Sequence, residues 1–237
     1  DCLLSRGLGD VYKRQAMTYG EYMKGVVQGE KNILFVNMAW GLGLGIIIDG
    51  NLYYGKSGFS GELGHFCMFE NEVLCHCGKK GCLETEASGS AFHRILMERY
   101  REGSNTILAG KLDSGEEISL GDLLEAVRKE DVLCIDILEK MGVNLGKGIA
   151  GLMNIFNPEL VILGGTLSLA GEYISLPIKS AIRKYSLNLV NQDTEIKISK
   201  LGERAGAFGA CLLSRSKLLG MIPVSYTHLT LPTNSRV

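Results

Sequence analysis

Residues 33–54 read ILFVNMAWGLGLGIIIDGNLYY, and this stretch decides the fold class. Its first part, residues 33–39, has the β-branched and large apolar composition typical of a strand. The glycine-spaced segment at residues 41–45 predicts a turn that leads into a buried strand at residues 46–49. A second turn leads into a third strand at residues 52–54. We therefore expect a meander of three strands.

The flanking sequence alternates between helical and extended patterns. We predict helices at residues 16–25, about 85–101, 119–129, 131–156, 171–186 and 205–219, and strands at residues 160–163 and 195–199. Pro158 ends one of these helices, because proline disfavours the helical conformation in the residue before it. Residues 55–83 show no clear periodicity. Helices interleaved with strands in this way predict an α/β fold.

The composition excludes several classes of protein. Hydrophobic residues make up 46% of the chain, charged residues 22%, and the formal net charge is −1, without a dense basic run, so nothing indicates a surface for nucleic acid or anionic membrane. No apolar stretch approaches the roughly 18–20 residues that a membrane span needs. Seven cysteines are an odd number, and three of them crowd together. This pattern favours a metal site in a reducing compartment, so we expect a cytoplasmic protein.

The two ends of the chain look foreign to the rest. Residues 1–15 and 223–237 resemble sequencing-adapter DNA read as protein. The alternative interpretation is a pair of ordinary frayed termini. On the first interpretation, residues 16–222 form the natural domain, truncated at its N-terminus, and both end segments are excluded from reasoning about the fold.

Residues 75–82, CHCGKKGC, are the strongest chemical signal in the sequence. Three cysteines in one tight loop present three soft ligands, and Gly78 and Gly81 permit the turns that direct the sulfur atoms to one point. Zn²⁺ prefers four tetrahedral nitrogen or sulfur ligands, and such a closed site is structural. The alternative is a set of buried free thiols. From the residues alone, the candidates for the fourth ligand are His65, His76 and Cys67, and His76 is disfavoured because its neighbouring cysteines would point away from it.

Three motifs together resemble the signature of the ROK family (repressors, open reading frames and sugar kinases). They are GELGH at residues 61–65, CHCGKKGCLE at residues 75–84 and ASG at residues 87–89. The resemblance covers residues 16 to about 220. It implies an actin-like ATPase or sugar-kinase fold, which is ribonuclease H-like, with two α/β lobes around a cleft. This chain would be mostly the C-terminal part of that fold, with a zinc-binding loop.

The resemblance also implies roles for individual residues. His65 would be the fourth zinc ligand, beside Cys75, Cys77 and Cys82, and Glu62, His65 and Glu84 would line a sugar site. A carboxylate can accept hydrogen bonds from two sugar hydroxyls, and the metal would orient the imidazole ring of His65. The alternative is that Glu62 and Glu84 are solvated loop carboxylates.

The family's nucleotide site is represented only weakly. The phosphate hairpin of the family carries glycine and threonine where this chain has Ala39 and Trp40. An indole supplies no small hydroxyl donor and would press on a phosphate. The candidate nucleotide-binding residues are Gly41, Gly43, Gly164 and Gly165. The alternative is that the hairpin glycines only provide positive φ and that the other glycines, with residues 206–210, allow close packing.

The resemblance places the family's general base, an aspartate, at Lys13. A lysine does not accept a hydroxyl proton at neutral pH, and the first phosphate motif, D-x-G-x-T, is absent from the sequence. We therefore expect no catalytic residue and no phosphorylation of sugar by this chain.

We predict the sugar-binding effector portion of a ROK transcriptional regulator, with a hexose or N-acylhexosamine ligand. We expect a homodimer that makes no membrane contact and no DNA contact of its own, while the parent protein would bind DNA through a lost helix-turn-helix. The alternative is the C-terminal part of an ATP-dependent ROK hexokinase or N-acylhexosamine kinase, and only this alternative requires ATP and Mg²⁺. A weaker third class is a zinc-stabilised protein without a ligand site.

Overall fold

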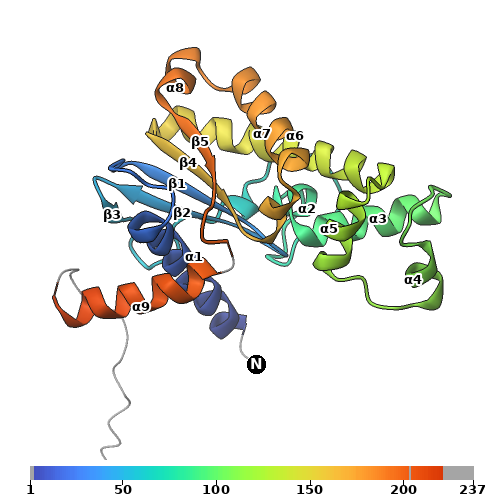
Figure 1. Ribbon diagram of the computed structural model, residues 1–237, viewed down its shortest axis with the longest axis horizontal. Coiled ribbons are helices and arrows are strands. Elements are labelled where there is room, and N and C mark those ends of the chain that lie inside the picture. The colour runs from blue at the N-terminus through green and yellow to red at the C-terminus, as the bar shows by residue number, and fades with distance from the viewer. Residues whose placement is uncertain (1–2, 203, 221–237) are drawn as a thin grey trace, which may run out of the picture.

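The computed structural model describes residues 3–202 and 204–220 of the chain. Within these residues, one mixed sheet has the strand order β3-β2-β1-β4-β5 (Figure 1). The strands are β1 (Ile33–Met38), β2 (Leu42–Ile48), β3 (Asn51–Leu52), β4 (Leu160–Gly164) and β5 (Glu195–Ile198). The first three pair antiparallel, whereas β4 pairs parallel with both β1 and β5. The predicted meander and the α/β class are confirmed.

The helices account for most of the remaining chain. They are α1 (Leu3–Lys24), α2 (Glu84–Ala87), α3 (Gly89–Arg101), α4 (Ala109–Ser114), α5 (Leu120–Arg128), α6 (Val132–Phe156), α7 (Glu172–Tyr185), α8 (Asn188–Asp193) and α9 (Arg204–Leu218), with 3₁₀ helices η1 (Leu63–His65) and η2 (Thr166–Ala170). No helix in the described ranges is both long enough and apolar enough to cross a membrane.

Three boundaries differ from the sequence prediction. The segment expected to be a turn at residues 41–45 lies almost entirely inside β2, because glycines there pair with β1 in a regular register. The helix predicted at residues 85–101 is two helices, because Ser88 is extended and its Oγ accepts a hydrogen bond from the Ala91 amide at the start of α3. The first helix begins at Leu3 instead of residue 16.

The structure describes most of one adapter-like segment but none of the other. Residues 3–15 continue the same helix as residues 16–24, and nothing in this geometry tests whether they are foreign. The tail at residues 223–237 lies outside the described residues. Both adapter-like segments stay predictions.

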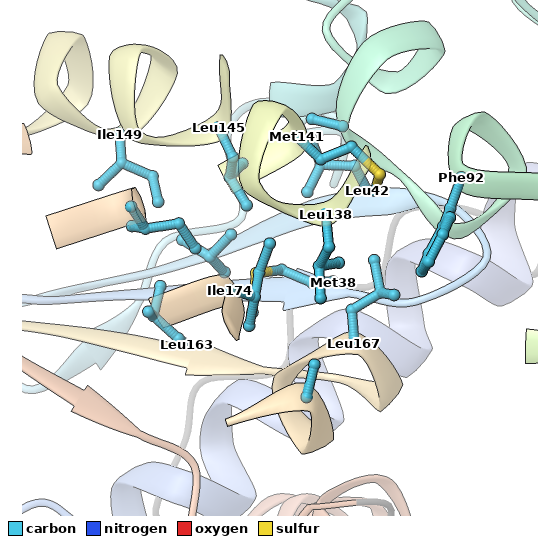
Figure 2. Packing of buried hydrophobic residues seen from close by; sticks show 14 of the residues in the cluster. Met38, Leu42, Phe92, Leu138, Met141, Leu145, Ile149, Leu163, Leu167 and Ile174 are labelled. Carbon is cyan, nitrogen blue, oxygen red and sulfur yellow. The ribbon is translucent and has the colours of Figure 1, made fainter. Parts of the chain in front are cut away.

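The alternating residues of β1 divide the core into two layers. Leu34, Val36 and Met38 join a large cluster with α3, α5, α6 and α7 on one face of the sheet (Figure 2). Ile33 and Phe35 join a smaller cluster on the other face, where α1 and α9 pack together (Figure 1). Because β1 is buried on both faces over residues 33–36, these four positions are all apolar, which explains the hydrophobic run at the start of the strand.

Small residues bring the helices of each layer into close contact. A methyl group at Gly146 of α6 would lie 2.6 Å from the Ile178 carbonyl oxygen of α7. On the opposite face, a methyl group at Gly209 of α9 would overlap with the backbone of Ala16 in α1. Gly209 belongs to the segment GAFGA, so close packing accounts for that motif.

Candidate functional site

The cysteine loop, residues 65–82, is held by backbone pairing and by two glycines with positive φ. The Cys75 amide donates to the Lys79 carbonyl oxygen at 2.8 Å, and the Gly78 amide donates to the Cys75 carbonyl oxygen at 2.9 Å. Gly78 and Gly81 have φ of 83° and 76°. A methyl group at Gly81 would also overlap with the Phe69 carbonyl oxygen. Both glycines therefore make the turns that their sequence positions predicted.

Four side chains of this loop converge on one point. They are His65, Cys75, Cys77 and Cys82, whose ligand atoms lie within 4.8 Å of one another. His65 Nδ1 is 3.5 Å from Cys75 Sγ, and Cys77 Sγ is 3.6 Å from Cys82 Sγ. A tetrahedral ion with metal–sulfur bonds of about 2.3 Å separates its ligand atoms by roughly 3.8 Å. The spacing of the four atoms fits one such ion.

The other two candidates for the fourth ligand lie outside this cluster. Among the described residues, the group with metal-ligand spacing contains His65 and neither His76 nor Cys67. The side chain of His76 is exposed, and the thiol of Cys67 lies near the Lys80 carbonyl oxygen. The fold therefore favours the fourth ligand that the family resemblance implies.

The surroundings of the loop affect the ionisation of its three thiols differently. Burial and the neighbouring thiols raise the pKa of Cys82 to about 12, and burial raises the pKa of Cys75. Burial also acts against the thiolate of Cys77, but hydrogen bonds from the Lys79 amide and from the other thiols lower its pKa overall. A divalent cation would stabilise all three thiolates at once.

Glu84 begins α2, two residues after Cys82, and reaches the tip of the β1–β2 hairpin. Its Oε2 accepts a hydrogen bond from the Leu42 amide at 2.9 Å. Methyl groups at Gly41 and Gly64 would lie 3.1 Å and 3.0 Å from the same oxygen. The carboxylate thus lies between the hairpin and η1, and the absence of side chains at Gly41 and Gly64 provides the space for it.

Glu62 precedes η1 and His65 ends it, and Glu62 contacts a residue that the sequence did not indicate. Arg14 of α1 forms an ion pair with both carboxylate oxygens of Glu62, with Nη1 at 3.2 Å from Oε2, and the second contact joins Nη2 to Oε1. His65 Nε2 is 3.8 Å from Glu62 Oε2. One ring nitrogen of His65 therefore faces the thiols and the other faces Glu62. Arg14 was missed because it is 48 positions from its partner in the sequence.

The hairpin glycines serve packing and not backbone conformation. Gly41, Gly43 and Gly45 are absent from the positive-φ residues of the described chain, so the expectation of positive φ is wrong. Methyl groups at Gly43 and Gly45 would overlap with the side chains of Arg14 and Thr18 in α1. These two glycines allow α1 to lie directly on the sheet.

Gly164 and Gly165 lie at the carboxyl end of β4, beside Asn37 and Met38 at the tip end of the same hairpin. A methyl group at Gly164 would lie 2.6 Å from the Phe35 ring, and one at Gly165 would overlap with the Met38 carbonyl oxygen. Gly165 also has φ of 83°. Packing and turn geometry account for both glycines, and a nucleotide role for them stays a prediction.

The positions where the chain departs from the kinase pattern are exposed. Lys13, at the position of the expected aspartate, has an exposed side chain on α1. Trp40 stands at the hairpin tip with 50% of its surface exposed. Its neighbour Ala39 donates its amide hydrogen to the Gly41 carbonyl oxygen at 3.0 Å, which makes the tip a tight turn.

Comparison with known proteins identifies the class. The model of the ROK family matches residues 12–217, and the chain belongs to the ROK family. It is 36% identical over 191 residues to a glucokinase of Halalkalibacterium halodurans, covering 80% of this chain and 58% of the glucokinase. It is 32% identical over 192 residues to a xylose repressor of Caldicellulosiruptor bescii, covering 79% of this chain and 47% of the repressor. The chain thus spans about half the length of these relatives.

Solved structures support the same class. A ROK transcriptional regulator described as a homologue of the Escherichia coli MLC protein has a TM-score of 0.78 at 34% identity, over 86% of this chain and 50% of the regulator. A ROK glucokinase from Streptomyces griseus, solved with glucose and AMPPNP, has a TM-score of 0.76 at 30% identity, over 86% of this chain and 67% of the kinase. The actin-like fold is shared by both kinds of protein, so fold alone does not separate regulator from kinase.

Proposed function

We propose that this chain is the sugar-binding effector portion of a ROK transcriptional regulator and that it has no kinase activity. Ala39 and Trp40 at the hairpin tip carry the assignment to a regulator, because a regulator need not hold ATP. The absence of kinase activity in this chain rests on Lys13, an exposed lysine in the adapter-like segment where the family resemblance places the aspartate that removes the hydroxyl proton. General-base catalysis needs a group that is unprotonated near neutral pH, which a solvated lysine is not. Trp40 at the hairpin tip also supports the proposal, because its indole replaces a small hydroxyl donor for phosphate.

We assign a structural Zn²⁺ ion to His65, Cys75, Cys77 and Cys82. Three thiolates and one imidazole are a preferred ligand set for zinc, and four protein ligands leave no open position for catalysis. When bound, the ion would supply positive charge that keeps the thiols ionised. The loop ends at Cys82, and this position brings Glu84, two residues later, into contact with the hairpin. His65 has one ring nitrogen beside the thiol of Cys75 and the other beside Glu62.

We assign the sugar to Glu84, His65 and Glu62. The Leu42 amide fixes the Glu84 carboxylate, which has capacity for further hydrogen bonds from sugar hydroxyls. His65 Nε2 faces the same side as Glu62. A hydroxyl that approaches Glu62 must share the carboxylate with Arg14, so Glu84 is expected to make the stronger contact.

The second candidate is the C-terminal part of an ATP-dependent ROK hexokinase or N-acylhexosamine kinase. The similarity to a glucokinase over 80% of the chain favours it, as does the position of Gly164 and Gly165 beside the hairpin that carries Gly41 and Gly43. In that case ATP and Mg²⁺ would be bound at these glycines. We also propose a homodimer without DNA contact by these residues, which sedimentation and operator-binding assays would test.

Calorimetry separates these candidates from a protein without a ligand site. The chain is titrated with glucose, N-acetylglucosamine and xylose, and each sugar is also offered with ATP in a coupled assay for ADP release. The proposal expects binding of at least one sugar and no ADP release. ADP release that rises with protein concentration and disappears in Glu62→Ala would favour the kinase. No binding of any sugar would overturn the sugar site.

A further inference from the structure

The indole of Trp40 is exposed although its surroundings are buried. Trp40 is 50% exposed, whereas Met38 and Leu42, which pair with each other next to the tip, are 0% and 5% exposed. Figure 2 shows Met38 and Leu42 within the hydrophobic cluster. Half of the indole surface is accessible to a ligand at the hairpin tip. This position is therefore distinct from the rest of the hairpin.

The backbone around Trp40 is rigid. The Ser90 amide of α3 donates to the Trp40 carbonyl oxygen at 2.9 Å, and the Gly89 amide donates to the Ala39 carbonyl oxygen at 2.8 Å. A methyl group at Gly89 would lie 3.1 Å from the Trp40 Cα atom, so the helix start and the tip are in close contact. The ring is also 5.9 Å from the ring of His93, centroid to centroid. A ring that is fixed before a ligand arrives loses little entropy on binding.

The tip is next to the carboxylate of the proposed sugar site. Glu84 Oε2 accepts from the amide of Leu42, two residues after Trp40, and lies 3.1 Å from the position of a methyl group at Gly41. The carboxylate is therefore adjacent to the tip in the fold, and a pyranose bound to it would extend over several ångströms beyond the hydrogen-bonded hydroxyl. Pyranose rings combine hydroxyl edges with a face of C–H groups, and an aromatic ring suits that face while a carboxylate suits the edge.

We infer that Trp40 is a specificity-determining residue that stacks on the C–H face of a neutral pyranose held at Glu84. The inference rests on the proposed sugar site and deepens it by naming the ligand class. The indole selects an unphosphorylated sugar, because a phosphate carried toward the tip would meet an apolar surface and lose its hydration without gaining a donor. His93 forms the second side of the aromatic pair and limits the movement of the indole.

The chain contains a single tryptophan, so its intrinsic fluorescence reports on Trp40 alone. Binding of glucose, N-acetylglucosamine or xylose, measured by calorimetry, should shift the emission to shorter wavelength and protect the indole from acrylamide quenching. Glucose 6-phosphate should bind at least tenfold more weakly than glucose if glucose is the sugar that binds. Trp40→Phe should retain most of the affinity, while Trp40→Ala should lower it about three- to tenfold.

Tyr53→Ala is the matched control, since Tyr53 is 48% exposed but lies beyond the far end of β2. It should leave sugar affinity unchanged, and circular dichroism should show that each variant is folded. Sugar binding by calorimetry with unchanged emission and equal affinity in Trp40→Ala would overturn this inference and leave the proposed function standing. Absence of binding by every sugar would overturn both. Protection of the indole that grows with protein concentration and not with sugar would assign it to contact between copies instead.

Discussion

The cysteine loop and the β1–β2 hairpin both carry closely spaced glycines, yet the glycines do different physical work. In the loop, Gly78 and Gly81 adopt positive φ, which side-chain-bearing residues rarely do. In the hairpin, Gly43 and Gly45 have ordinary strand geometry, and their missing side chains make space for α1. The same residue type at similar spacing therefore indicates backbone conformation in one place and interlayer packing in the other.

The two regions also differ in chemistry. The loop carries the four candidate metal ligands, from His65 to Cys82, and the candidate sugar-binding residues Glu62 and Glu84 lie directly before and after it. The hairpin corresponds in sequence to the phosphate hairpin that the family resemblance implies, but it has Ala39 and Trp40 at its tip. Because of this difference, we propose that the residues in and beside the loop bind sugar and that the hairpin does not support phosphate transfer.

The largest effect is expected from the loop. Cys82→Ser should reduce bound zinc from about one ion per chain to a small fraction and should destabilise the domain, because structural zinc contributes on the order of 10 kcal/mol of binding free energy in small domains. Elemental analysis and thermal unfolding measure the two consequences. Cys67→Ser is the matched control. The backbone of Cys67 pairs with the backbone of Cys82, but the thiol of Cys67 lies outside the ligand group. Full zinc occupancy in Cys82→Ser would refute the cluster.

The next effect concerns the hairpin and α1. The chain should release no ADP with glucose, mannose or their N-acetyl amines, and Lys13→Asp should not restore turnover. A missing general base costs about 10²–10⁴-fold, and the indole at the tip disturbs phosphate independently of it. Recovery of turnover in Lys13→Asp alone would show that the hairpin is a working phosphate site, and the contrast between the two regions would then disappear.

A smaller effect is expected at the carboxylate that joins the two regions. Glu84→Ala should weaken sugar binding by about 1.5–3 kcal/mol, the range for hydrogen bonds to a charged group. Calorimetry with the sugar that binds best measures the change. Glu70→Ala, an exposed carboxylate in the same loop, is the control and should leave affinity unchanged. Equal affinity in Glu84→Ala and in the unaltered chain would exclude Glu84 from the site.

The smallest effect tests the packing role of the hairpin glycines. Gly45→Ala should lower the free energy of unfolding by about 1–3 kcal/mol, because the added methyl group overlaps with Thr18 and forces α1 to shift. Gly151→Ala, in α6 with no atom within 4 Å of the added methyl group, should be neutral or slightly stabilising. Denaturant unfolding measures both. A Gly45→Ala variant as stable as Gly151→Ala would show that α1 adapts without cost.

The elements that sequence analysis located well are those with strong periodicity. The run at residues 160–163 and the long helix ending before Pro158 were located to within a residue or two. The short helices α4 and α8 were missed, because six residues contain too few turns for a pattern to be visible. The break at Ser88 was missed as well. A serine also occurs inside helices, and only the backbone shows that the Ser88 side chain accepts a hydrogen bond from the Ala91 amide and begins α3.

The sequence by itself determined the fold class, the ROK resemblance, the three thiols and the departures at Lys13 and Trp40, because these depend on local pattern and residue identity. Only the tertiary structure showed that His65, and not His76 or Cys67, lies with the three thiols, that the hairpin glycines make space for α1, and that Arg14 forms an ion pair with Glu62. The contacts of α1 with the hairpin and with Glu62 join segments that are distant in the chain and are brought together when α1 covers one apolar face of the sheet. The position of His65 depends on the backbone path of the loop, which shows no periodicity in sequence. Proximity of that kind follows from packing and leaves no mark on local sequence.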